Sequence, residues 1–108
     1  MTADELRLRT KRFALRIIRL VAALPKSTEG RAIATQLVRS GTSVAANYRA
    51  ACRAGSRSEF VAKMGVVLEE ADETQLWLEL IIESKQLSVT RIQPLLTEAS
   101  ELVAIFVA

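Results

Sequence analysis

The stretch SRSEFVAKMGVVLEEADETQLWLELIIE (Ser56–Glu83) decides the fold class. It opens on a capping box, because Ser56 and Glu59 stand three residues apart and can satisfy the first free amides of a helix. Apolar residues then recur at helical spacing, which places them on one face. The expected core residues of this segment are Phe60, Met64, Val67, Leu68, Ala71, Leu78 and Ile82. We therefore predict a long amphipathic helix over 56–83.

Two helices of the same kind are predicted before this segment. A capping box of Thr2 and Glu5 begins the first, which runs to Leu24. Ser27 is a suitable N-cap for the second, and Gly55 at its end suits the left-handed C-terminal position. Their expected core residues are Leu6, Phe13, Ile17, Leu20 and Leu24 in the first, and Ile33, Leu37, Val44, Tyr48 and Ala51 in the second.

A fourth helix is predicted after the 56–83 segment. Either Ser88 or Thr90 caps it, and Pro94 favours Thr90 because proline is tolerated only in a first turn. Its core residues are Leu95, Leu96, Ala99, Leu102, Val103 and Phe106. No useful stretch alternates with period two, so no strands are expected. Four such helices with short loops predict an all-α, antiparallel up-down-up-down four-helix bundle, with residues 1–108 as a single domain.

The residue types that most enzyme sites need are missing. The chain has no histidine, which is the side chain best suited to proton transfer near neutral pH and the commonest metal ligand. Cys52 has no second cysteine or histidine for zinc binding or a nucleophile pair. We expect no enzymatic activity, no metal and no cofactor.

No export signal or membrane span is expected. The start MTADELRL lacks the basic-then-apolar order of a secretion signal, and a lone cysteine cannot form an internal disulfide. The longest unbroken apolar run, 102–108, is far shorter than the roughly 20 residues that cross a bilayer. We expect a cytoplasmic protein that does not bind membranes.

The charges divide unevenly along the chain. Up to Arg57, twelve Lys and Arg residues against three acidic ones give +9, and from Ser58 three against nine give −6, which together make the net +3. The first helix also has a second apolar stripe, with arginines in the arc between the two stripes. The second stripe is Leu8, Leu15, Ile18 and Ala22, and the arginines are Arg9, Arg12, Arg16 and Arg19. Two apolar faces exceed the need of one bundle, which indicates self-assembly.

The predicted contact between subunits joins this arginine-rich face to the acidic face of the 56–83 helix, where Trp77 would anchor it. A solvated acidic face is the alternative. The predicted interface residues are Leu8, Arg9, Leu15, Ile18, Arg19, Glu69, Glu70, Glu73 and Trp77.

Five arginines are candidates for binding nucleic acid, namely Arg12, Arg16, Arg49, Arg53 and Arg57. Arginine suits both carboxylate and phosphate, so salt bridges between subunits, phosphate contacts and a solvated surface all remain open. Few aromatics and no known nucleic-acid motif predict low sequence specificity. Ser43 and Asn47, one turn apart, are expected to hydrogen-bond between helices and fix their register.

Four segments together resemble one family: FALRIIRLVAALPKSTEG (Phe13–Gly30), QLVRSGTSVAANYRAA (Gln36–Ala51), RAGSRSEFVAKM (Arg53–Met64) and EADETQLWLEL (Glu70–Leu80). The chain is similar to the four-helix-bundle proteins encoded in intervening sequences of bacterial 23S ribosomal RNA genes. The resemblance implies a left-handed bundle without known enzymatic activity, homopentameric rings, and RNA or DNA binding as a hypothesis. A more distant bundle of this kind works beside a reverse transcriptase, so an adaptor oligomer is the alternative. Gly41 departs from the alanine that the resemblance implies.

Overall fold

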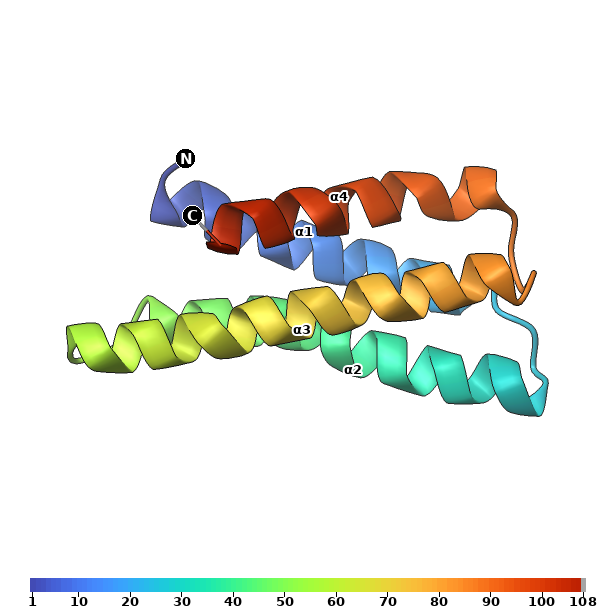
Figure 1. The fold of residues 1–108 in the computed structure, drawn as a ribbon, viewed down its shortest axis with the longest axis horizontal. Coiled ribbons are helices and arrows are strands. Elements are labelled where there is room, and N and C mark those ends of the chain that lie inside the picture. Colours follow the sequence, from blue (N-terminus) through green and yellow to red (C-terminus); the bar gives the residue numbers. More distant parts are fainter. Residues whose placement is uncertain (108) are drawn as a thin grey trace.

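Four helices form the part of the chain that the structure describes. The structure is a computed structural model and describes residues 1–107. The helices are α1 (Ala3–Val21), α2 (Thr28–Ala51), α3 (Arg57–Glu83) and α4 (Val89–Val107). Consecutive helices run in opposite directions, α2 packs on α1 and α3, and α4 packs on α3 and less extensively on α1 (Figure 1). The prediction of an all-α up-down-up-down four-helix bundle is confirmed.

Three of the predicted helix starts are also confirmed. The side-chain oxygens of Thr2, Ser27 and Ser56 each accept a hydrogen bond from the amide three residues on, over 3.1 Å in every case. Each cap satisfies one of the free amides that a helix leaves at its first turn. These spacings therefore set where α1, α2 and α3 begin.

The predicted start of α4 at Thr90 is wrong. The helix begins at Val89, and Ser88 is the cap, because its Oγ accepts from the Arg91 amide over 3.3 Å. Pro94 therefore lies beyond the first turn and removes one hydrogen bond to the Thr90 carbonyl. Thr90 and Pro94 are both exposed, so water can satisfy that carbonyl.

The predicted left-handed position at Gly55 is also wrong. In residues 1–107 the positive φ belongs to Lys85, at 59°, and to no glycine. Lys85 ends α3 in a Schellman motif, in which the Gln86 amide bonds the Ile81 carbonyl and the Lys85 amide bonds the Ile82 carbonyl, each over 3.0 Å. The last turn of α2 instead tightens into i to i−3 hydrogen bonds.

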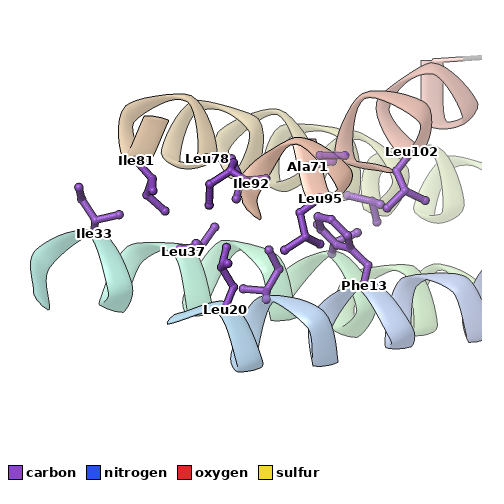
Figure 2. Packing of buried hydrophobic residues seen from close by; sticks show 14 of the residues in the cluster. Phe13, Leu20, Ile33, Leu37, Ala71, Leu78, Ile81, Ile92, Leu95 and Leu102 are labelled. Atoms are coloured by element: carbon purple, nitrogen blue, oxygen red, sulfur yellow. The ribbon is translucent and has the colours of Figure 1, made fainter. Parts of the chain in front are cut away.

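The predicted apolar stripes of α1 and α2 meet those of α3 and α4 in one core (Figure 2). Phe13, Leu37, Leu78 and Leu102 have almost no exposed surface. Six further buried residues other than glycine were not predicted as core: Thr10, Ala14, Ser40, Thr74, Ile81 and Ile92. The three polar ones were missed because each hydroxyl bonds a backbone carbonyl of its own helix, which lets it lie in an apolar core.

The small residues predicted to permit close packing do so at Gly41. A Cβ built on Gly41 would lie 3.0 Å from two side-chain carbons of Ile17 on α1. Ile17 itself is fully buried. Glycine at this position therefore allows α1 and α2 to approach more closely than alanine would.

Ser43 and Asn47 were predicted to hydrogen-bond between helices, but another pair of residues forms such a bond. Asn47 Nδ2 donates to the Ser43 backbone carbonyl of the same helix over 2.9 Å. The buried link between helices joins α3 to α2, where Thr74 Oγ1 donates to Ser40 Oγ over 3.0 Å. Ser40 and Thr74 are both fully buried in the core, whereas Ser43 and Asn47 are only half-buried.

Phe60 is not a core residue, contrary to the prediction. It is 42% exposed, although it lies on the same face of α3 as Val67 and Ala71. The reason is length, because α3 has 27 residues and α4 has 19. The α2–α3 end of the bundle extends past the described end of α4 (Figure 1). Phe60 belongs to the first turn of α3, which lies at that end. No helix in residues 1–107 is long and apolar enough to cross a membrane.

Candidate interaction surfaces

The second apolar stripe of α1 remains uncovered in the folded chain. Leu8, Leu15 and Ile18 are 41–46% exposed. Leu15 and Ile18 line a groove of about 420 Å³ between α1 and α2, which we call the α1–α2 groove. Its apolar lining also includes Ala14, Ala45 and Ala46, and its charged residues are Arg7, Lys11 and Arg49. The groove therefore combines an apolar floor with a basic edge.

One end of the groove is strongly basic. A hollow of about 330 Å³ is lined by Arg7, Leu8, Lys11, Arg49 and Arg53, and we call it the basic end. Arg49 and Arg53 were predicted as ligand-binding residues, and Leu8 as an interface residue. Arg7 and Lys11 were not predicted, although they are one turn apart on α1. Their role depends on α1 lying beside the C-terminal half of α2, which no local pattern reveals.

The remaining predicted arginines lie apart from the basic end. Arg12, Arg16 and Arg19 line a separate hollow with Leu15 on α1 alone, and Arg16 and Arg19 also line a hollow against α4. Arg57 is exposed in the first turn of α3. The structure thus divides the predicted nucleic-acid-binding residues into three places instead of joining them.

Arg9 has its acidic partners within the chain. Its Nε and Nη2 donate to the two carboxylate oxygens of Glu98 over 2.8 and 2.7 Å, and Nη2 also bonds Glu101 over 3.0 Å. The bonds to Glu98, more than those to Glu101, hold the pKa of Arg9 above its ordinary value. Arg9 therefore ties α1 to α4, and its contact with another subunit stays a prediction.

The acidic residues of α3 divide between two sides of the helix. Glu70 and Glu73 pair with Arg39 of α2, Glu70 over 3.0 Å. Trp77 lies half-buried against the core on the same side, and its Nε1 is buried without an acceptor within residues 1–107. Glu69 points outward instead.

The outer face of α3 is both acidic and apolar. Its exposed residues follow helical spacing and lie opposite the core stripe of α3. They are Glu69, Asp72, Leu76, Glu79 and Leu80. Only Glu69 was predicted as an interface residue here, because the sequence does not show which flank of the acidic face α2 covers.

Comparison with known proteins identifies the family. Residues 5–108 match the family described as 23S rRNA-intervening sequence protein. The chain belongs to that family. A crystal structure that resembles this member of the 23S rRNA-intervening sequence protein family comes from Bacteroides thetaiotaomicron VPI-5482 and is described as a protein with unknown function from the S23 ribosomal protein family. The two are 32% identical, each is covered over 94% of its length, and the TM-score is 0.87. No curated protein matches the chain.

The two prominent surfaces of the chain are the α1–α2 groove and the outer face of α3. Within residues 1–107, no three Asp, Glu or Cys side chains are grouped so that they could hold a metal ion. The α1–α2 groove offers apolar area with cations at its edge, and the outer face of α3 offers apolar area with carboxylates. The two surfaces are complementary in charge and alike in apolar character.

Proposed function

We propose that this chain is a non-enzymatic homo-oligomeric bundle, in which the outer face of α3 of one copy lies in the α1–α2 groove of the next. The supporting observation is the uncovered stripe of Leu8, Leu15 and Ile18. An apolar patch with a polar rim on a folded domain marks an interaction site. Burial of these side chains would contribute about 25 cal/mol for each Å² of apolar surface removed from water.

Charge complementarity supports α3 as the occupant. Lys11 and Arg49 border the groove, while Glu69 and Asp72 border Leu76 on the outer face of α3. The contact joins two different surfaces, so it is heterologous, and such contacts close into rings when the rotation allows. The family resemblance leads us to propose five copies in the ring.

Sedimentation of a groove variant tests the assembly. Ile18→Glu puts a carboxylate on the apolar floor and is expected to yield monomers at concentrations where the unchanged protein is assembled. Val89→Glu is the matched control, because Val89 is an exposed apolar residue of α4 outside both surfaces. A monomeric unchanged protein, or equal dissociation of both variants, would refute the proposal.

We also propose that cations left uncovered by assembly contact the phosphates of RNA or DNA with low sequence specificity. Arg53 lines the basic end but not the α1–α2 groove, so a neighbour's α3 in the groove would leave it uncovered, and it forms no ion pair within the described residues 1–107. Released counterions make phosphate binding depend on salt. Affinity for an oligonucleotide should therefore fall as salt rises, and Arg53→Gln should reduce the slope of log affinity against log salt. An affinity that does not change with ionic strength would contradict the phosphate contacts.

A purely structural or adaptor oligomer is the second candidate. The observation in its favour is that Arg49 lines both the apolar groove and its basic end, so a neighbour's α3 would cover it. Arg9 and Arg39 are already paired within the chain. In that case the assembled protein has no affinity for nucleic acid, and the free surfaces would serve a protein partner such as a reverse transcriptase. Binding measured on the assembled species separates the two candidates.

A further inference from the structure

The end of the molecule where α2 and α3 extend past α4 (Figure 1) contains the first turn of α3, and with it the aromatic residue Phe60. Phe60 is 42% exposed and continues the core face of α3, seven residues before the fully buried Val67. At the level of Val67 the other helices cover this face, and at Phe60 they do not. The apolar core stripe of α3 therefore ends in an open ring that a planar ligand can reach.

Cations surround this ring. Arg57 and Lys63 lie three residues before and after Phe60, and residues at that spacing are neighbours on a helix surface. Arg53 lies in the turn that leads into α3. None of these three cations forms an ion pair within residues 1–107. We call Arg53, Arg57, Glu59, Phe60 and Lys63 together the hairpin tip.

The single acidic residue of the hairpin tip is held by the backbone. Between residues 53 and 63 the sequence has one carboxylate, Glu59. Its Oε2 accepts a hydrogen bond from the Gly55 amide over 3.0 Å, and its own amide bonds the Ser56 cap. The tip therefore has three cations against one carboxylate, and that carboxylate takes part in the turn.

We propose that the hairpin tip binds single-stranded RNA or DNA, with one base stacked on Phe60 and the neighbouring phosphates on Arg57 and Lys63. The inference rests on the proposed nucleic-acid function and adds the form of the ligand. Every base has a π-face, so stacking on an aromatic side chain tolerates any sequence. Bases within a duplex are already stacked and cannot reach the ring, so the site discriminates against duplex.

The experiment compares binding of labelled oligo-dT, oligo-U and a duplex of matched length to the full chain at one low salt concentration. Phe60→Ala and Phe60→Leu should weaken single-strand binding by about 5- to 150-fold, because stacking of one base is worth about 1–3 kcal/mol. Duplex binding should not change. Phe60→Trp should retain single-strand binding, since it keeps a stacking surface. The oligo-dT and oligo-U arms show whether the site distinguishes DNA from RNA.

Val61→Ala is the matched control, since Val61 is 59% exposed on the next position of the same turn but has no ring. It should leave both kinds of binding unchanged. Arg57→Gln should weaken single-strand binding and reduce its salt slope, whereas the Phe60 variants should leave that slope unchanged. Phe60→Leu retains apolar volume, so it keeps the test valid if Phe60→Ala fails to fold.

Three results would overturn the inference, and they can be told apart. If the Phe60 variants lose no more affinity than Val61→Ala, or lose duplex and single-strand binding equally, base stacking is excluded while the phosphate contacts stand. If they change the mass of the assembly instead, Phe60 contacts a second copy. If the unchanged protein binds neither form of nucleic acid, the proposed nucleic-acid function fails as well.

Discussion

At the scale of single residues, two helical glycines differ in the space that the fold leaves for a side chain. A Cβ on Gly41 would lie 3.0 Å from two side-chain carbons of Ile17, so Ile17 would have to shift, whereas a Cβ on Gly65 would meet nothing within 4 Å. Gly65→Ala should therefore raise the free energy of unfolding by about 0.5–1 kcal/mol through helix propensity alone. Gly41→Ala gains the same propensity but forces stiff, buried Ile17 to shift, and overpacking costs about 1–3 kcal/mol.

We therefore expect Gly41→Ala to lower the free energy of unfolding by about 1 kcal/mol net. Urea unfolding of both variants under conditions that keep the chain in one oligomeric state measures the difference. Equal stabilisation by the two substitutions would show that Ile17 relaxes without cost. The close approach of α1 and α2 would then not require glycine.

Tyr48 makes the free energy of unfolding depend on pH in the alkaline range. Burial, reinforced by the neighbouring Cys52 thiol, raises the pKa of Tyr48 to about 12 from its ordinary 10.0. The folded state thus favours the neutral phenol. Its contribution is fully present below pH 10, the unfolded pKa, and is lost as the pH rises through the folded pKa of about 12. Stability should fall with pH across this window.

Tyr48→Phe removes this titration and keeps the ring that stacks on Phe106, with centroids 6.2 Å apart. Between pH 10 and 12 the unchanged protein should lose about 2 kcal/mol more stability than the variant, from a shift of about two pKa units. Urea midpoints at the two ends of the window provide the measurement. A parallel decline in stability of the two proteins would rule out the tyrosine as the cause.

At the scale of helices, α1 and α4 pack on each other less extensively than the other neighbouring helices do, and Arg9 joins them through Glu98 and Glu101. The Arg9–Glu98 pair is part-buried, with 24% and 16% of the side chains exposed, while the Arg7–Asp4 pair within α1 is exposed at 41% and 84%. Exposed pairs contribute about 0–1 kcal/mol. A bidentate, partly desolvated pair that joins two helices contributes more.

Glu98→Gln should therefore lower the free energy of unfolding by about 1–2 kcal/mol, since it leaves the Arg9 guanidinium without its main partner. Asp4→Asn, the matched control, should cost no more than about 0.5 kcal/mol. Thermal unfolding of the two variants tests the contrast. A smaller loss from Glu98→Gln than from Asp4→Asn would mean that apolar packing alone holds α1 to α4.

The elements that were predicted correctly are those encoded by short spacings. Thr2, Ser27 and Ser56 cap their helices because the residue type and the free amide three positions on belong to the same turn. The errors at Gly55 and Thr90 come from the opposite situation. The local rules favoured those residues, but α2 ends in i to i−3 hydrogen bonds that need no left-handed residue. Pro94 is tolerated in a second turn because the carbonyl that it leaves without a partner is exposed to solvent.

At the scale of the whole molecule, the core was predictable and the surfaces were predictable only in part. Helical spacing predicted core positions that are indeed buried, because one face of each helix must be covered whatever its neighbours are. Examples are Phe13, Ile17, Leu37 and Leu78. The grouping of Arg7 and Lys11 with Arg49 could not be predicted, since it depends on which helices are adjacent. The exposure of Phe60 depends on the difference in length between α3 and α4.

Assembly and nucleic-acid binding should respond differently to salt, because different forces support them. The proposed subunit contact buries Leu15 and Ile18 against Leu76, and apolar burial is not screened by ions. Affinity for nucleic acid falls as salt rises. Each phosphate contacted on a single strand adds about −0.7 to the slope of log affinity against log salt. With four contacts, a fourfold rise in salt should weaken oligonucleotide binding by about 50-fold.

The same rise should leave the mass of the assembly in sedimentation unchanged. Trp77 is the only tryptophan of the chain, so its fluorescence can follow folding in the same samples. Dissociation of the assembly by salt would mean that the carboxylates of α3 and the cations of the groove, not the apolar stripe, hold the subunits together. The basic end would then be occupied by a neighbour, and Arg49 and Arg53 would be unavailable to phosphate.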